Sequence, residues 1–93
     1  MEIKHQSDGR RGSFYLEVEG SKKAEMVYVM AGPKKMIIEH TEVDEELKGQ
    51  GVGLQLLKKL VDWVRNEEIK VIPLCPFAKA TFARHAELRD VLN

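Results

Sequence analysis

Three glycines separated by single residues stand directly before an amphipathic segment, in the run Lys48-Gly49-Gln50-Gly51-Val52-Gly53. Glycines let backbone N–H groups approach a ligand closely, and the first turn of a helix offers unpaired N–H donors with a partial positive charge. Phosphate is the natural ligand of such a place. The alternative is an ordinary turn with glycine near a helix cap, and the local chemistry alone does not decide between the two.

Two familiar phosphate-binding motifs do not fit this run. A Walker loop requires Lys and then Ser or Thr after its last glycine, whereas Gly53 is followed by Leu54. A dinucleotide-binding fingerprint requires a small residue where Leu56 stands. Both motifs are therefore excluded.

The segments on either side of the glycine run predict the elements that position it. Alternating or continuous apolar residues predict three strands, at 14–18, 24–31 and 35–43, joined by turns at 20–22 and 32–33. Residues 1–6 predict a further strand at the edge of the sheet. Because the turns are short, we expect these strands to form an antiparallel meander.

The pattern changes period after Val43. Apolar residues at helical spacing predict a helix that begins near Val52 and ends between residues 66 and 68, followed by a strand at 70–74 and a helix at 76–85. A strand, helix, strand unit places strands 36–43 and 70–74 parallel through a right-handed crossover. Ligands of such units bind where the strands end and the helix begins. The sequence therefore predicts one α/β (α+β) domain over residues 1–93.

The glycine run also resembles the acetyl-CoA motif of the GCN5-related N-acetyltransferases, [RQ]-x-x-G-x-[GA], with Lys48 at the first position. Two further segments, His40-Thr41-Glu42-Val43 and Cys75-Pro76-Phe77, occur in the order that is typical of a minimal single-domain subfamily of these proteins. The resemblance extends from Ile37 to His85. It implies a minimal fold of this family, in which antiparallel strands lead into the crossover with splayed parallel strands and a C-terminal helix follows.

The resemblance also implies how coenzyme A would bind. Backbone N–H groups of the glycine run would hold the pyrophosphate, and the pantetheine arm would lie beside the main chain of residues 41–43. Pro73 fits a splay of the parallel strands, because proline has no N–H to donate to a sheet. The implied cofactor-binding residues are Thr41, Glu42, Val43, Lys48, Gly49, Gln50, Gly51, Val52 and Gly53.

Cys75, the only cysteine, is the first candidate catalytic residue. Cysteine is often buried for packing alone. However, Pro76 suits the first position of a helix, which would place Cys75 at its N-cap, and a helix N-terminus favours the thiolate form. In acetyl transfer, such a thiol could protonate the departing sulfur of coenzyme A or accept the acetyl group itself.

His40 is the second candidate catalytic residue. On a regular strand it would share a face with Met36 and Ile38, as a histidine at the edge of the core. Alternatively, it could act as a base or orient Cys75 across the paired strands. Glu39 and Glu42 are also candidate bases, although charged residues at a strand end are more often simply solvated.

Composition narrows the remaining choices. Fifteen Lys and Arg balance fifteen Asp and Glu, which argues against a nucleic-acid binder. One cysteine and three scattered histidines predict no metal site and no internal disulfide. The longest apolar run, Met26–Ala31, is too short to cross a membrane, and the first ten residues do not form a signal peptide. We therefore expect a cytoplasmic monomer.

Three hypotheses follow. The first is an acetyltransferase that uses acetyl-CoA and an amine acceptor, which could be a small molecule or a protein amine. The second is a coenzyme A-binding module with little catalysis, which the small size of the chain makes credible. The third is a partner-binding domain in which the glycines only form a turn. The sequence does not identify the acceptor.

Overall fold

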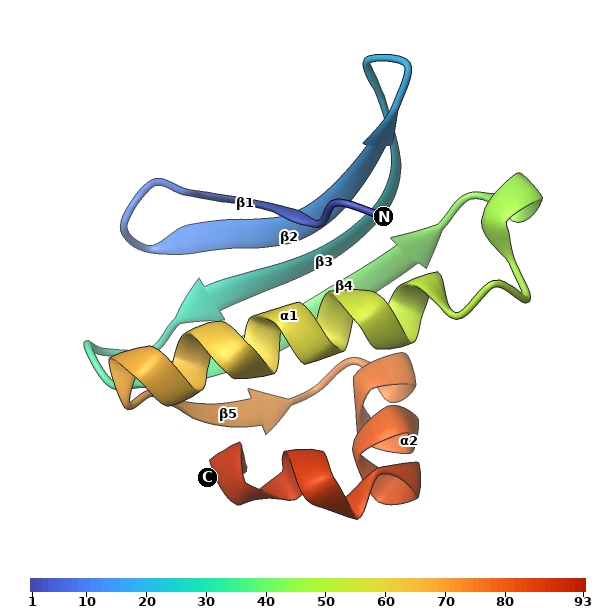
Figure 1. Ribbon diagram of the computed structural model, residues 1–93. Coiled ribbons are helices and arrows are strands. Elements are labelled where there is room, and N and C mark those ends of the chain that lie inside the picture. The colour runs from blue at the N-terminus through green and yellow to red at the C-terminus, as the bar shows by residue number, and fades with distance from the viewer.

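A five-stranded sheet organises the computed structural model, which describes residues 1–93 (Figure 1). The strand order is β1-β2-β3-β4-β5; β1 to β4 pair with one another in antiparallel fashion, and β5 runs parallel to β4. The strands are β1 (Lys4–Ser7), β2 (Arg11–Val18), β3 (Ser21–Met30), β4 (Lys35–Val43) and β5 (Lys70–Pro73). The helices are η1 (Glu45–Leu47), α1 (Val52–Glu67), α2 (Pro76–Arg84) and η2 (Ala86–Val91). The predicted meander and crossover are confirmed.

The turn between β2 and β3 differs from the prediction. Ser21 and Lys22 were expected in the turn but belong to β3, and the turn consists of Glu19 and Gly20. Both turn residues have positive φ, 52° and 81°. A two-residue turn with this backbone matches the right-handed twist of a hairpin, so the strands pair up to its ends.

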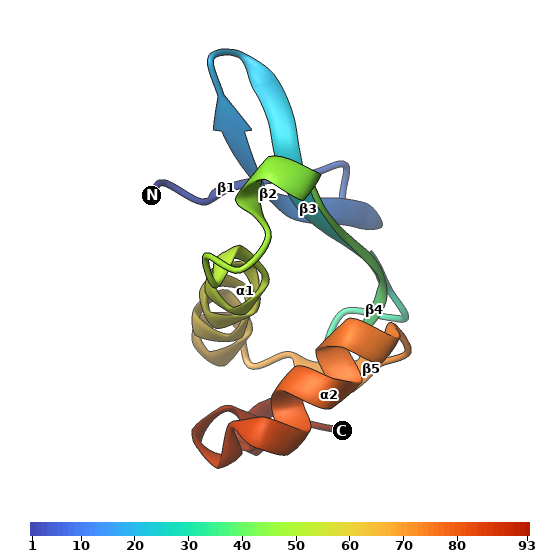
Figure 2. The same cartoon turned by 90° about the vertical axis from the view of Figure 1, so that its right-hand side faces the viewer.

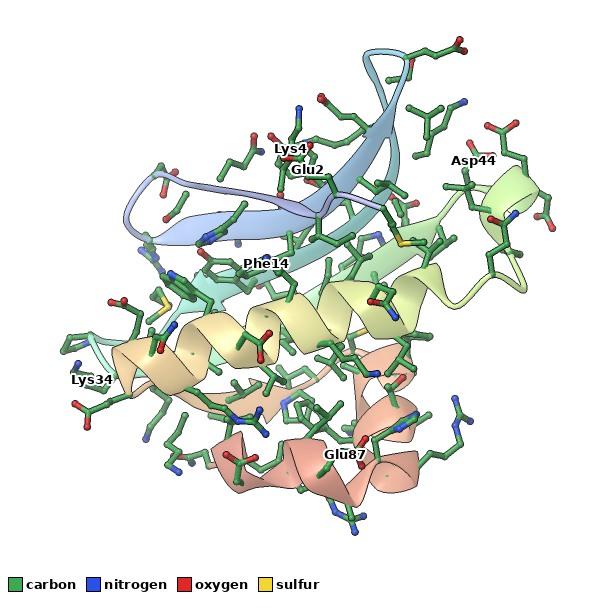
Figure 3. The ribbon with its side chains drawn as sticks, viewed as in Figure 1. Glu2, Lys4, Phe14, Lys34, Asp44 and Glu87 are labelled. Carbon is green, nitrogen blue, oxygen red and sulfur yellow. The ribbon has the colours of Figure 1, made fainter.

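The core lies between the sheet and α1. The apolar stripe predicted for the helix is fully buried, from Val52 through Leu56, Leu57, Leu60, Val61 and Val64. It packs on the inward side chains of the strands, of which Phe14 lies between β2 and the helix (Figure 3). Seen along α1, the helix covers one face of the sheet while α2 lies beyond β5 (Figure 2). This arrangement leaves the start of α1 beside α2.

The two parallel strands separate halfway along β4. Their pairing ends where Ile38 faces Pro73, and β4 continues to Val43. Beyond Pro73, the N–H groups of Leu74 and Cys75 both donate to the carbonyl of Ile38, at 3.0 and 3.1 Å, as the chain turns away. The splay implied by the family resemblance is therefore present, and it frees one edge of β4.

The C-terminal segment after α2 packs against the last turn of α1 and against β5. Arg65 of α1 binds Asp90 of η2 through two hydrogen bonds, of 3.0 and 2.6 Å, and this lowers the pKa of the Asp90 carboxyl. The N–H of Asn93 donates to the carbonyl of Val71 at 3.0 Å and so covers part of the outer edge of β5. None of the helices has the length and apolar character needed to span a bilayer.

Candidate functional site

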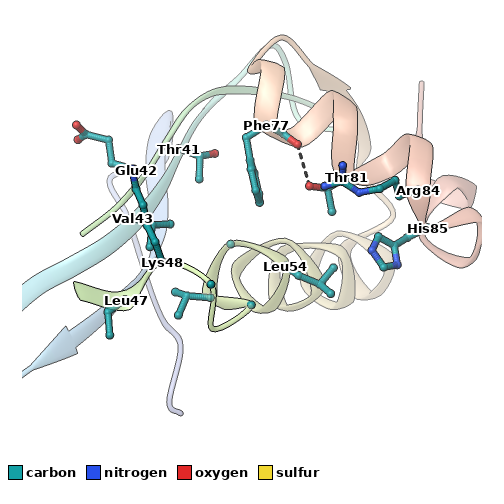
Figure 4. Close-up of a pocket in the computed structure, with 14 residues that line it drawn as sticks. Thr41, Glu42, Val43, Leu47, Lys48, Leu54, Phe77, Thr81, Arg84 and His85 are labelled. Carbon is teal, nitrogen blue, oxygen red and sulfur yellow. Dashed lines mark hydrogen bonds between the residues drawn. The ribbon is translucent and has the colours of Figure 1, made fainter. Parts of the chain in front are cut away.

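A cavity of about 740 Å³ opens where β4 ends, α1 begins and α2 passes (Figure 4). This volume lies within the roughly 300–1,000 Å³ that is typical of small-molecule sites. Its walls come from the strand end, from the loop before α1, from the first turn of α1 and from one face of α2. The lining residues are Thr41, Glu42, Val43, Leu47, Lys48, Gly49, Gly51, Val52, Gly53, Leu54, Phe77, Thr81, Arg84 and His85.

The start of α1 offers free backbone donors to this cavity. Gly49 and Gly51 have φ of 83° and 74°, a left-handed backbone that favours glycine. The first hydrogen bond within the helix runs from the N–H of Gln55 to the carbonyl of Gly51, at 3.1 Å, so the N–H groups of the preceding turn have no acceptor inside the helix. No side chain caps these donors, and the first turn carries no acidic residue. This geometry suits an anion.

Gly53 has a separate reason to be glycine. Its backbone is helical, but a Cβ atom there would overlap the ring of Phe77. The close approach lets the first turn of α2 pack on the first turn of α1, and the exposed part of the Phe77 ring forms one wall of the cavity. The third glycine therefore shapes the site through packing, whereas Gly49 and Gly51 shape it through the backbone turn.

The free edge of β4 forms the opposite wall. The N–H of Asp44 donates to the carbonyl of Lys23 on the β3 side, and alternate residues of a strand point their peptide groups to opposite sides. The peptide groups of Thr41 and Val43 therefore point toward the side that β5 has left. An extended ligand arm could hydrogen-bond there as a further strand would.

A bulge in β4 corrects the expected position of His40. Val27 of β3 faces His40 and Tyr28 faces Ile38, so Glu39 is an extra residue in β4. The extra residue reverses the alternation, which brings Thr41 rather than His40 to the inner face of the strand. The prediction that His40 shares a face with Met36 and Ile38 is therefore wrong. Its side chain is 59% exposed, and its Nε2 lies 3.3 Å from Oε1 of Glu42.

Cys75 is the N-cap residue of α2, with Pro76 at the first helical position, as expected. The thiol is a free cysteine and only 4% of the residue is exposed. Its Sγ donates to Oγ1 of Thr41 at 3.3 Å, so the residue that contacts the thiol is Thr41 and not His40. Cys75 lies behind the cavity wall, and Thr41 stands between it and the cavity.

The expected cofactor-binding residues all line the cavity except Gln50. The Gln50 amide instead donates to the carbonyl of Glu46 at 3.3 Å. Lys48 lines the cavity and lies 3.4 Å from Glu45, and both side chains are largely exposed.

Sequence reasoning missed the contribution of α2. Phe77, Thr81, Arg84 and His85 all line the cavity, although none of them is among the cofactor-binding residues that the family resemblance implies. The signal was available, since residues 77, 81 and 84 are spaced so as to share one helical face. His85 Nδ1 lies 3.4 Å from Glu87 Oε2; the backbone N–H of Glu87 first, and then His85, lowers the pKa of that carboxyl.

Known proteins with the same features identify the class. The family model described as GCN5-related N-acetyl-transferase matches residues 13–91. The chain therefore belongs to the GCN5-related N-acetyltransferase family. The family resemblance of the three ordered motifs is confirmed.

Individual relatives agree with this assignment. Protein NATD1 of Danio rerio is 32% identical over 76 residues, which are 81% of this chain and 67% of that protein. A GCN5-like protein of Staphylococcus aureus, whose NMR structure presents it as a candidate N-acetyltransferase, is 35% identical with a TM-score of 0.75 and covers 99% of this chain and 87% of its own. The ribosomal-protein-S18-alanine N-acetyltransferase of Escherichia coli has a TM-score of 0.69 at 19% identity, over 84% of this chain and 53% of its own, which shows a shared fold.

Proposed function

We propose that this protein is an acetyl-CoA-dependent N-acetyltransferase that transfers the acetyl group to an amine. The observation that carries the proposal is the uncapped start of α1, which opens into the cavity beside the free edge of β4. Free N–H donors suit a pyrophosphate, and an unpaired strand edge suits an amide-containing arm such as pantetheine. These two features meet in one cavity, in a chain of this family.

The binding roles follow from these positions. The N–H groups of Val52, Gly53 and Leu54 would bind the pyrophosphate, with Lys48 adding charge from the loop. The peptide groups of Thr41 and Val43 would hold the pantetheine arm. The splay after Ile38 directs that arm toward the N-cap of α2, where Cys75 lies.

The chemical roles are proposed for Cys75, Thr41 and His40. Acetyl-CoA supplies an acetyl thioester. When the amine nitrogen forms its bond to the acetyl carbon and the carbon–sulfur bond breaks, the amine must lose a proton and the sulfur must gain one. Cys75 would provide the proton for the sulfur through the Thr41 hydroxyl, which lines the cavity and accepts from the thiol at 3.3 Å. His40 does not itself line the cavity, but its Nε2 lies 3.3 Å from Glu42, which does, and His40 would accept the proton of the amine from that position.

One observation favours a second function, a coenzyme A-binding module with little catalysis. The Cys75 thiol is almost fully buried and does not line the cavity. In such a module, the thiol would only fill space between α2 and β4, and the cavity would bind the cofactor without transferring its acetyl group.

An acetylation assay separates these functions. The protein is incubated with acetyl-CoA and a panel of amines that includes polyamines, amino acids and peptides with free N-termini or lysines, and the release of free coenzyme A is measured. Release that depends on both an amine and Cys75 supports the transferase. Tight binding of acetyl-CoA with no release for any amine supports the module. If acetyl-CoA does not bind, both functions are wrong.

Compartment and assembly are part of the proposal. We infer a cytoplasmic monomer, because a single free thiol is compatible with a reducing compartment and because one chain forms the whole cavity. Light scattering of the purified protein tests the monomer, and microscopy of a tagged chain in its native cell tests the compartment.

A further inference from the structure

The cavity has two ends with different chemistry (Figure 4). Glu42 and Lys48 lie at the end formed by β4 and the loop before α1. Arg84 and His85 lie at the other end, and Leu54 of α1 lies between the two groups. A ligand anchored at the start of α1 therefore has one arm directed along β4 and another directed toward the last turn of α2.

Arg84 is a cation without a counterion at that second end. Two other arginines are paired with carboxylates, Arg11 with Glu39 at 2.7 Å and Arg65 with Asp90 at 2.6 Å, whereas Arg10 and Arg89 lie outside the cavity and have no such partner. None of the ion pairs includes Arg84. A guanidinium stays protonated at all physiological pH values, so this end of the cavity carries a permanent positive charge.

The neighbouring polar groups are already engaged. The Thr81 hydroxyl donates to the carbonyl of Phe77 at 2.8 Å, within α2. His85 Nδ1 lies beside the carboxylate of Glu87. Arg84 is therefore the permanent cation at this end, none of its side-chain donors is engaged within the protein, and its planar fork of N–H groups matches a phosphate.

Coenzyme A carries a phosphate in the corresponding place. Its pyrophosphate joins the pantetheine arm to an adenosine whose ribose bears a further phosphate on the 3′ oxygen. When the pyrophosphate lies at the start of α1 and pantetheine follows β4, the ribose lies on the side away from β4. That side is the Arg84 end of the cavity.

We propose that Arg84 binds the ribose 3′-phosphate and makes the site select coenzyme A over dephospho-coenzyme A. This inference rests on the proposed function, since it requires a cofactor anchored at α1. It adds a residue of α2 that determines specificity, and it assigns the end of the cavity that the pantetheine arm does not use.

Calorimetric titration of the whole chain with three probes tests the inference: coenzyme A, dephospho-coenzyme A and adenosine 3′,5′-bisphosphate. The variant is Arg84→Gln, and the matched control is Lys79→Gln, which removes an exposed cation from the same helix outside the cavity. We expect the native protein to bind coenzyme A about tenfold more tightly than dephospho-coenzyme A, as one partly exposed charged hydrogen-bond pair would give. Arg84→Gln should abolish that difference, and Lys79→Gln should keep it.

Each result decides something. Loss of the difference in Arg84→Gln alone, with unchanged affinity for dephospho-coenzyme A, supports the inference. A difference that survives in Arg84→Gln, or equal binding of the two cofactors by the native protein, overturns the inference and leaves the proposed function intact. If the native protein binds neither cofactor, the proposed function itself is wrong. Arg84→Lys keeps the positive charge and should retain part of the preference for coenzyme A over dephospho-coenzyme A. This result would show that Arg84→Gln acts through the lost charge and not through a loss of fold.

Discussion

Gly51, before α1, and Gly20, between β2 and β3, both have the left-handed backbone that favours glycine. Their φ values are 74° and 81°, and a Cβ atom would meet no other atom at either position. We expect alanine at either position to lower the free energy of unfolding by about 1–2 kcal/mol, because a left-handed backbone is strained for alanine. Only Gly51→Ala should also weaken binding of acetyl-CoA, since its methyl group stands beside the free N–H donors of α1.

Thermal melts and calorimetric titrations of both variants measure these two effects separately. Equal affinity of Gly51→Ala and Gly20→Ala for acetyl-CoA would show that the ligand does not approach the start of α1.

Cys75 is the residue that separates an enzyme from a binding module. Cys75→Ala should keep acetyl-CoA affinity, because the pyrophosphate donors lie in another element, and should lose acetyl transfer. Cys75→Ser keeps a proton donor in nearly the same volume and should retain part of the rate. Thr41→Val, which removes the hydrogen-bond partner at 3.3 Å, should lower the rate with little change in affinity. The rates come from release of coenzyme A; full activity in Cys75→Ala would assign the thiol to packing.

At the scale of elements, α1 and α2 meet through Gly53 and Phe77. A methyl group at Gly53 would overlap the Phe77 ring, and overpacking of this kind costs about 1–3 kcal/mol. In a Phe77→Ala background the overlap disappears, and Gly53→Ala should instead stabilise the helix by up to about 1 kcal/mol. Denaturant unfolding of the two single variants and the double variant measures this coupling. An equal effect of Gly53→Ala in both backgrounds would contradict the packing described.

The bulge in β4 marks the limit of sequence reasoning for the elements. Helix α1 and strands β3 to β5 could be predicted within a few residues, since their apolar periods are clear. The extra residue Glu39 has no signal in composition, because a bulge depends on pairing with β3. An extra residue moves every later side chain of the strand to the other face. Thr41 therefore lies on the inner face of β4, where His40 was predicted.

The part of the site on α2 was missed for a related reason. Its residues have the spacing of one helical face, but spacing alone does not say which face meets a cavity. The contact between Phe77 and Gly53 decides that question, and it joins segments far apart in the sequence. The glycine run and the strand end, by contrast, could be predicted because they are close in the sequence, at the two ends of the connection from β4 to α1.

At the scale of the whole molecule, stability should depend on pH through His5. This side chain stacks on Phe14 and its Nε2 lies 2.6 Å from the Tyr28 hydroxyl, and burial lowers the pKa of His5 below the ordinary value of 6.5. Protonation therefore favours the unfolded chain. The free energy of unfolding should fall as the pH decreases through about 6.5 toward the folded-state pKa, and it should be regained as the pH rises.

The His5→Gln variant isolates this contribution. Between about pH 7 and pH 5 the native protein should lose more stability than His5→Gln, whereas both should respond alike below about pH 4.5, where carboxyl groups titrate. Urea unfolding across this range provides the measurement. Parallel curves for the two proteins throughout would show that His5 carries no part of the pH dependence.

Titration of the ¹⁵N-labelled protein with acetyl-CoA, followed by residue-resolved NMR, tests the central claim most directly. The donors at the start of α1 and the free edge of β4 predict that the largest amide shifts fall in residues 48–54 and 41–43, with smaller shifts near residues 81–85. Saturation with shifts confined to other parts of the chain, or no shift at millimolar acetyl-CoA, would contradict the account.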